Sequence, residues 1–240
     1  MPSVTVYARF LAIGLLGVSG CGSESSAAGD GGGVDPTDPV DPVDPIDPPS
    51  ALSIATASES AAYYNTLLPD FAFVRDAAVT NDATVFSTMP TTGTVTYAGY
   101  MNLIMGNSSV SANVIGEATI QASFAINAIS GSATDFLGVA TDEYDTNHVA
   151  HYAGTITIVD GDIIAGTDGT AGIDIEITGA LDNGLNVFAV DGNLVGGFYG
   201  PNAEGLSVLG SNSGIHGNIS TTIDGMTGTI GIATISAVTP

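Results

Sequence analysis

Regular alternation of apolar and polar residues in the second half of the chain is the feature that most restricts its fold. Between residues 118 and 126, Ala, Ile, Ala, Phe and Ile occupy every second position, with mostly polar residues between them. The same alternation recurs over residues 155–158 and, with three isoleucines, over residues 173–178. A period of two places apolar side chains on one face of an extended chain, so each segment is predicted to form a half-buried β-strand.

Short segments that contain Asp-Gly or Asn-Gly are predicted to be the turns between these strands, because such residues tolerate the positive φ angles that hairpin turns require. They lie at residues 159–162, 167–169, 182–184, 191–193 and 224–225. Strand and turn therefore alternate about every ten residues, and the count is near eight strands. An antiparallel meander leaves exposed edges unless it closes. We therefore expect an all-β fold over residues 89–240, an up-and-down antiparallel barrel of about eight strands.

A barrel that crosses a membrane shows the same alternation, but it also carries girdles of aromatic residues at both interfaces. This chain has no tryptophan, eight tyrosines and eight phenylalanines. A barrel outside the bilayer is therefore the expectation.

The N-terminus carries the pattern of a bacterial lipoprotein signal peptide. Residues 10–18 form an apolar run behind Arg9, too short for the roughly 20 residues of a membrane-spanning helix. Residues 18–21 look like a lipobox ending at Cys21, the only cysteine. We expect a signal peptide over residues 1–20, removal of that peptide, and acylation of Cys21. The alternative is an ordinary secretory peptide, which would leave a lone thiol unexplained. Gly22, rather than aspartate, follows the cysteine and favours the outer membrane of a Gram-negative bacterium.

Residues 21–50 are interpreted as a spacer behind the anchor. Five Asp-Pro pairs recur there every three residues between Asp35 and Pro49. Proline at this spacing excludes helix and sheet and favours a disordered but extended polyproline II chain, about 45 Å long at ~3.1 Å per residue. A cation-binding stripe of aspartates is the alternative interpretation. Residues 51–88 are expected to form an N-terminal extension, with weak helical character over residues 58–68 only.

The charge balance restricts the partners. Asp and Glu number 25, whereas Arg9 and Arg75 are the only basic residues besides histidine. A surface of this sign excludes nucleic acid as a partner and favours cationic ones, either metal ions or basic protein surfaces.

The polar residues of the sequence do not indicate an enzyme active site. The spacing of the three histidines indicates no Ser-His-Asp arrangement, and no phosphate-binding Gly-x-x-x-x-Gly-Lys occurs. Carboxylates and imidazoles are densest within ten residues that could hold zinc, iron or calcium. The candidate ligands are Asp142, Glu143, Asp145, His148 and His151. A solvated acidic loop is the alternative. No cofactor other than the covalent lipid is expected, and a bound metal or haem stays open.

One motif resembles a known family. Eight consecutive residues resemble the GxFYGPxAxE signature of the transferrin-binding protein B β-barrel superfamily of surface lipoproteins. They are Gly197, Phe198, Tyr199, Gly200, Pro201, Asn202, Ala203 and Glu204. Residues 89–99 resemble that family's first barrel strand, and residues 128–133 resemble an early strand. The motif is expected to make a tight turn, with Phe198 and Tyr199 on opposite faces of the strand; direct ligand contact is the alternative.

The resemblance implies a lipoprotein anchored in the outer membrane at the cell surface, whose barrel captures a solute, an iron or haem source, or a protein ligand. Transferrin itself is not expected, because this chain has one barrel and at most a short extension in place of a handle domain. Relatives that bind transferrin carry two lobes, each a barrel paired with a handle. The alternative function is a structural or adhesive protein whose barrel is filled with side chains and holds no small ligand.

Overall fold

A computed structural model describes residues 57–141, 147–214 and 216–240. The predicted signal peptide, Cys21 and the Asp-Pro spacer lie outside the described residues. The elements in chain order are α1 (Ala57–Val79), the short 3-10 helix η1 (Phe86–Thr88), β1 (Thr94–Gly106), β2 (Ser111–Ser123), β3 (Ala128–Thr141), β4 (Asn147–Ala165), β5 (Ala171–Asp182), β6 (Val187–Tyr199), β7 (Gly205–Ser211), β8 (Ile219–Ile223), β9 (Met226–Thr227) and β10 (Ile230–Val238).

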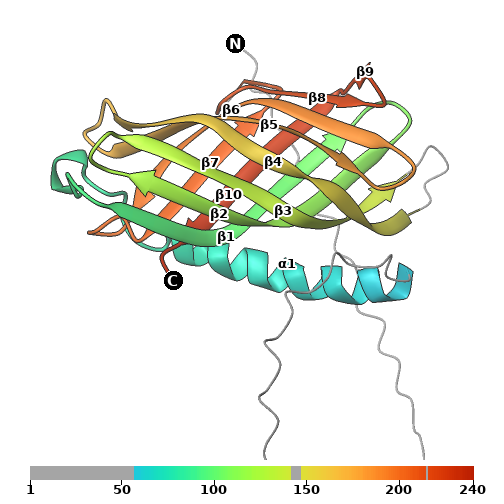
Figure 1. Cartoon of the computed structure of the whole chain (residues 1–240), viewed down its shortest axis with the longest axis horizontal. Coiled ribbons are helices and arrows are strands. Elements are labelled where there is room, and N and C mark those ends of the chain that lie inside the picture. Colours follow the sequence, from blue (N-terminus) through green and yellow to red (C-terminus); the bar gives the residue numbers. More distant parts are fainter. Residues whose placement is uncertain (1–56, 142–146, 215) are drawn as a thin grey trace, which may run out of the picture. The chain divides into compact units, whose positions relative to one another are not determined.

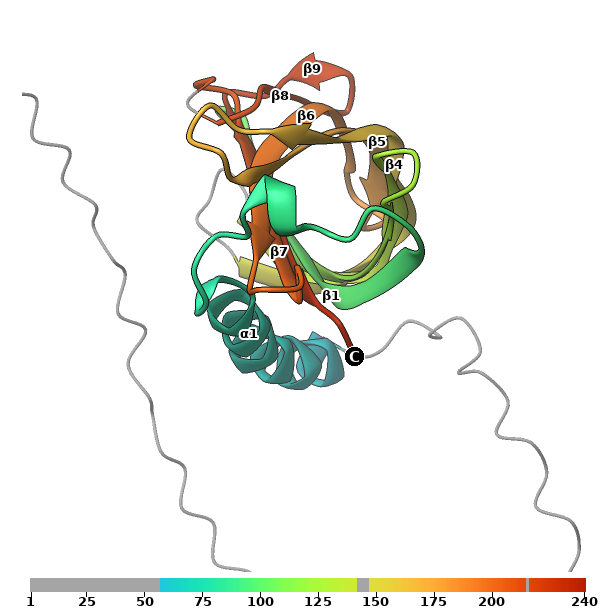
Figure 2. The same cartoon turned by 90° about the vertical axis from the view of Figure 1, so that its left-hand side faces the viewer.

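The strands close into an antiparallel barrel (Figures 1 and 2). Neighbours along the chain pair from β1 to β6, and β10 closes the ring between β1 and β7. β6 pairs with β7 along residues 195–199 and with β8 along residues 188–192, so β7 and β8 share one position in the ring. β9 is the short second arm of a hairpin with β8. The ring therefore has eight positions, which confirms the predicted fold class.

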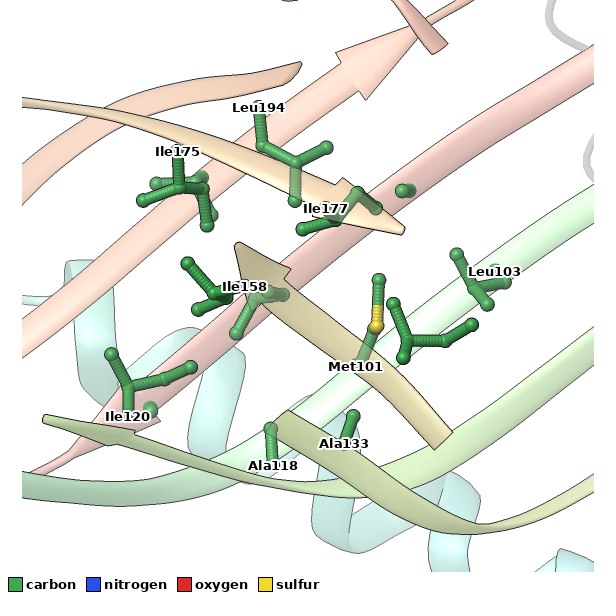
Figure 3. Close-up of a cluster of buried hydrophobic side chains, with 14 of the residues drawn as sticks. Met101, Leu103, Ala118, Ile120, Ala133, Ile158, Ile175, Ile177 and Leu194 are labelled. Carbon is green, nitrogen blue, oxygen red and sulfur yellow. The ribbon is translucent and has the colours of Figure 1, made fainter. Parts of the chain in front are cut away.

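The barrel interior is filled with apolar side chains (Figure 3). The alternation in the sequence is the reason, since Ile120, Ile156 and Ile175 point inward and each is at most 2% exposed. Large side chains from several strands complete the packing, among them Tyr97, Met101, Phe136, Tyr152, Phe188 and Phe198. Each fully buried side chain of this size contributes about 1.5–3 kcal/mol, so the filled interior is the main source of stability.

Helix α1 packs on the outside of the barrel (Figure 2). Tyr64 and Leu67 of the helix are buried against Ile115 of β2 and Leu137 of β3, two apolar residues that point outward. The helix is longer than the predicted stretch of residues 58–68, because it continues through Pro69 to Val79. Pro69 removes one backbone hydrogen bond from the helix. The helix is maintained by packing on both sides of this residue, because Leu67 before it and Ala78 after it are buried. Among the described helices, none is both long and apolar enough to cross a bilayer.

Residues 80–93 cross one end of the barrel (Figure 2). The Thr84 amide donates a 2.9 Å hydrogen bond to the carbonyl oxygen of Phe198 in β6. The Thr84 carbonyl oxygen accepts a 2.7 Å hydrogen bond from the amide of Ala171 in β5. The side chain of Met89 joins the interior cluster. This part of the N-terminal extension therefore covers the end of the barrel.

Two of the five predicted turns are wrong. Residues 159–162 lie inside β4 at a register shift, and residues 191–193 lie inside β6. A Cβ on Gly161 would lie 2.7 Å from the carbonyl oxygen of Ile129, and one on Gly192, at φ +143°, would meet the carbonyl oxygen of Asn218. These glycines allow backbones to approach closely, which the sequence pattern alone does not distinguish from a turn. The other three segments are turns, as predicted.

Candidate functional site

Hollows occur on the outer side of the barrel and at the end that residues 80–93 cross. One, of about 390 Å³, lies on the outer side of β4, β5 and β6. Another, of about 280 Å³, lies between Phe86 and Met89 of the segment that crosses the barrel end and Phe124 and Ile163 beside the turn after β2.

The larger hollow is lined by carboxylates, which we call the acidic face. It comprises Asp160, Asp162, Asp174, Glu176 and Asp191. Asp160 lies opposite Glu176, and Asp162 lies opposite Asp174, across the β4–β5 pair. Like charges directly opposite each other destabilise a sheet. One side-chain amide relieves part of this repulsion, because Asn193 Nδ2 donates a 3.2 Å hydrogen bond to Asp174 Oδ1.

The acidic face attracts cations in general, since its field is negative. The described residues nevertheless contain no group of three or more His, Cys, Asp or Glu side chains arranged to hold a metal ion. This face was not predicted from the sequence, because two of its three segments were interpreted as turns. The signal was present: acids recur at every second position in residues 160–162 and 174–176, which places them on one face of a strand.

The histidine cluster predicted to bind metal is only partly visible. Asp142, Glu143 and Asp145 lie outside the described residues, and His148 belongs to β4 but its side chain is not described. His151 pairs with Leu137, so it points outward beneath α1. Its Nε2 atom is buried and has no hydrogen bond to a described residue. The metal site stays a prediction.

The family motif forms the turn between β6 and β7. Phe198 points inward, with its ring centroid 6.0 Å from that of Tyr97 and 6.1 Å from that of Phe124. Gly200 has φ +90° and Ala203 φ +57°, and the Ala203 amide donates a 3.3 Å hydrogen bond to the Gly200 carbonyl oxygen. Thr84 Oγ1 donates a 2.6 Å hydrogen bond to the same oxygen. The turn therefore anchors the segment that covers the barrel end.

Glu204 completes this turn. Its carboxylate accepts hydrogen bonds from the backbone amide of Asn202 at 3.0 Å and from Asn202 Nδ2 at 2.8 Å. These bonds hold the pKa of Glu204 below its usual value. Pro201 follows Gly200 on the exposed side of the turn, and Tyr199 pairs with Ala83. The contacts of the motif described here are structural, although direct ligand contact by its exposed residues stays an open prediction.

The opposite end of the barrel carries exposed apolar side chains, which we call the loop rim. Its apolar members are Leu185, Val187 and Met226, which are 74%, 43% and 58% exposed, and its acids are Asp182 and Asp224. Asp224 joins its two loops, because its carboxylate accepts 2.8 Å hydrogen bonds from the Val187 amide and from Asn186 Nδ2. These bonds lower the pKa of Asp224. From the sequence these segments were predicted only as turns. The signal for an exposed apolar residue was Leu185, which lies directly after a predicted turn and before Asn186.

Comparison with solved structures finds similar folds. A solved structure of intact Ap-TbpB, with its N and C lobes, matches with a TM-score of 0.41 and 20% sequence identity. The match covers 65% of this chain and 28% of that chain, so this chain spans less than a third of that protein's length. The barrel is consistent with the resemblance that the sequence motif indicates. No family model and no curated protein matches the chain.

Proposed function

We propose that this protein is a lipoprotein anchored through Cys21 at the outer membrane surface, and that its barrel binds a protein ligand on its outside. The observation that carries the proposal is the filled interior: the inward side chains of β1–β8 and β10 form one buried cluster. Small barrels packed in this way leave no room for a ligand along the axis. A ligand would therefore contact the outer faces or loops, as a protein surface can.

The anchor and spacer explain why such a surface would be held away from the membrane. Acyl chains on Cys21 would retain the protein, and the Asp-Pro segment would separate the barrel from the bilayer by about 45 Å if fully extended. The strongly acidic composition, 25 acids against two arginines, favours a ligand with a basic surface.

The filled interior equally favours a second candidate, a structural or adhesive protein without a specific ligand. The two candidate functions differ in whether the outer surface of the barrel binds one partner saturably. Solute capture, including iron or haem, is the version of the binding function that the packed interior disfavours.

The test uses residues 22–240, which lack the signal peptide and Cys21, for measurements in solution, and full-length protein in cells. Replacing Cys21 by Ser should move the protein from the membrane fraction to the soluble fraction. Protease added to intact cells should digest the anchored protein. Thermal unfolding with haem, ferric chelates, zinc or calcium at fixed ionic strength should leave the midpoint unchanged. A midpoint rise corresponding to the ~2.7 kcal/mol expected at 100 times the Kd would contradict a protein ligand and restore solute or metal capture.

A further inference from the structure

The loop rim exposes three large apolar side chains. Leu185 lies in the loop between β5 and β6, Val187 begins β6, and Met226 begins β9 next to β8 (Figure 1). Val187 and Asp224 are joined by the backbone as well as by the Asp224 carboxylate, because the Asp224 amide donates a 2.9 Å hydrogen bond to the Val187 carbonyl oxygen. The three apolar residues therefore lie on adjoining loops at one end of the barrel.

These loops hold their apolar side chains outward by local hydrogen bonds. Asp182 Oδ1 accepts a 2.7 Å hydrogen bond from the Gly184 amide. Asn183 Oδ1 accepts hydrogen bonds from the amides of Leu185, at 3.0 Å, and of Asn186, at 2.8 Å. A surface ordered in this way before binding loses little conformational entropy on binding. The exposure of Leu185 is thus a property of an ordered loop.

Charge identifies the class of partner. Asp182 and Asp224 flank the apolar residues, and the chain has 25 acids against two arginines. A second copy of this chain would bring like charge to the contact, which costs free energy. A partner with Lys or Arg around an apolar centre would match both features, and the flexible side chain of Met226 could adapt to it.

We propose that the loop rim is the docking surface, and that its partner is a protein whose contact surface is apolar at the centre and basic around it. This inference rests on the proposed function, because it names where the ligand binds and what chemistry the ligand presents.

Site-specific photo-crosslinking on intact cells tests the proposal. A benzophenone amino acid is placed in the full-length protein at Leu185 or Met226, in the loop rim. One control position is Ile126, which is 73% exposed, like Leu185, but lies at the opposite end of the barrel. A second control is Val159, which is 56% exposed and borders the acidic face.

We expect one discrete protein adduct from Leu185 and Met226, absent from Ile126, whose yield falls as salt is raised. Mass spectrometry of the adduct should place the crosslink in an apolar site flanked by Lys or Arg. An adduct of twice the chain mass, an acidic contact surface, or equal labelling from Ile126 would overturn the proposal. An adduct from Val159 alone would overturn the loop rim as the docking surface but would leave the proposed function standing. No adduct at any position would contradict both this inference and the proposed function.

Binding of the crosslinked partner then gives a quantitative check. The double variant Leu185→Ser/Met226→Ser should weaken binding at least tenfold, whereas Ile126→Ser should leave it unchanged. Equal thermal midpoints of the wild type, the double variant and Ile126→Ser would show that the loss of binding is not caused by unfolding. Unchanged binding by the double variant would overturn the proposal.

Discussion

Tyr97 in β1 donates a 2.7 Å hydrogen bond from its hydroxyl to the carbonyl oxygen of Ala203, 106 residues later in the turn between β6 and β7. Tyr97 is fully buried, and β10 and β7 lie between its strand and β6 in the ring. The bond therefore ties the family motif to the first strand across the end of the barrel.

Replacing Tyr97 by Phe should destabilise the protein. The change leaves the Ala203 carbonyl oxygen without this donor in a buried site, which costs about 1–3 kcal/mol. Urea unfolding followed by circular dichroism gives the free energy of unfolding. Tyr199→Phe is the matched control, because Tyr199 is only partly buried, and it should change that free energy by less than about 0.5 kcal/mol. Equal effects of the two changes would show that the Tyr97 bond contributes nothing specific.

Replacing Tyr152 by Phe should, in contrast, stabilise the protein. Tyr152 is fully buried against Phe188, with ring centroids 5.6 Å apart. Its hydroxyl lies near the Asn183 side chain but makes no hydrogen bond of good geometry to a described residue. Removing a buried hydroxyl that lacks a partner should stabilise the fold, by about 1 kcal/mol. The same urea experiment measures it. A loss of stability as large as that of Tyr97→Phe would mean that the hydroxyl is satisfied, for example by water.

The two buried tyrosines should also make the fold sensitive to alkali. Burial raises the pKa of Tyr152 to about 12, an effect that the nearby Asn183 side chain partly offsets. Burial, and secondarily the charge of Glu204, raises the pKa of Tyr97. A tyrosine in the unfolded chain ionises near pH ~10. Because the folded state holds these protons more tightly, stability is complete below about pH 10 and is lost as pH rises beyond it.

Urea midpoints measured from pH 8 to 12 check this dependence. The wild-type midpoint should fall above about pH 10, and the double variant Tyr97→Phe/Tyr152→Phe should show a shallower fall. Tyr199→Phe should follow the wild type. Parallel curves for the wild type and the double variant would assign the alkaline loss to other groups.

The strands were predictable because the interior is apolar and the outside polar. In β5, the isoleucines at 173, 175 and 177 are all buried, as the period of two requires. The same rule failed at Ile126, which is 73% exposed because the strand ends at Ser123 and the chain turns. Alternation therefore predicts which face is buried but does not mark where a strand stops.

The candidate surfaces were less predictable, because they depend on which residues are neighbours across strands. Asp-Gly in residues 160–161 and 191–192 has the composition of a turn, yet both pairs lie within long strands where glycine permits close packing. That distinction decides whether Asp160 and Asp162 are turn residues or part of a charged face. Helix α1 was underestimated for a related reason: its residues beyond Pro69 are held by the barrel, and local propensity carries no information about it.

Adjacent leucines in α1 should respond differently to truncation. Leu67 is 4% exposed against the barrel, whereas Leu68 is 39% exposed. Leu67→Ala should destabilise helix docking by about 2–5 kcal/mol, and Leu68→Ala should have a much smaller effect. Hydrogen exchange should show faster exchange of α1 amides in Leu67→Ala, with the barrel amides less affected. Similar exchange in both variants would contradict the packing of α1 described above.

Neutralising one carboxylate of the acidic face should stabilise the barrel. Asp162 lies directly opposite Asp174 and is exposed, so Asp162→Asn removes a cross-strand repulsion worth about 0.2–1 kcal/mol at low salt. The gain should vanish near 1 M salt, where the Debye length is only ~3 Å. Asp70→Asn on α1 is the matched control, because it removes one negative charge equally, and Asp70 is not part of the acidic face. Urea unfolding of both variants in 0.01 M and 1 M salt separates the local effect from the general one. Equal gains from the two substitutions would mean that the net charge of the chain, rather than the Asp162–Asp174 pair, sets this part of the stability.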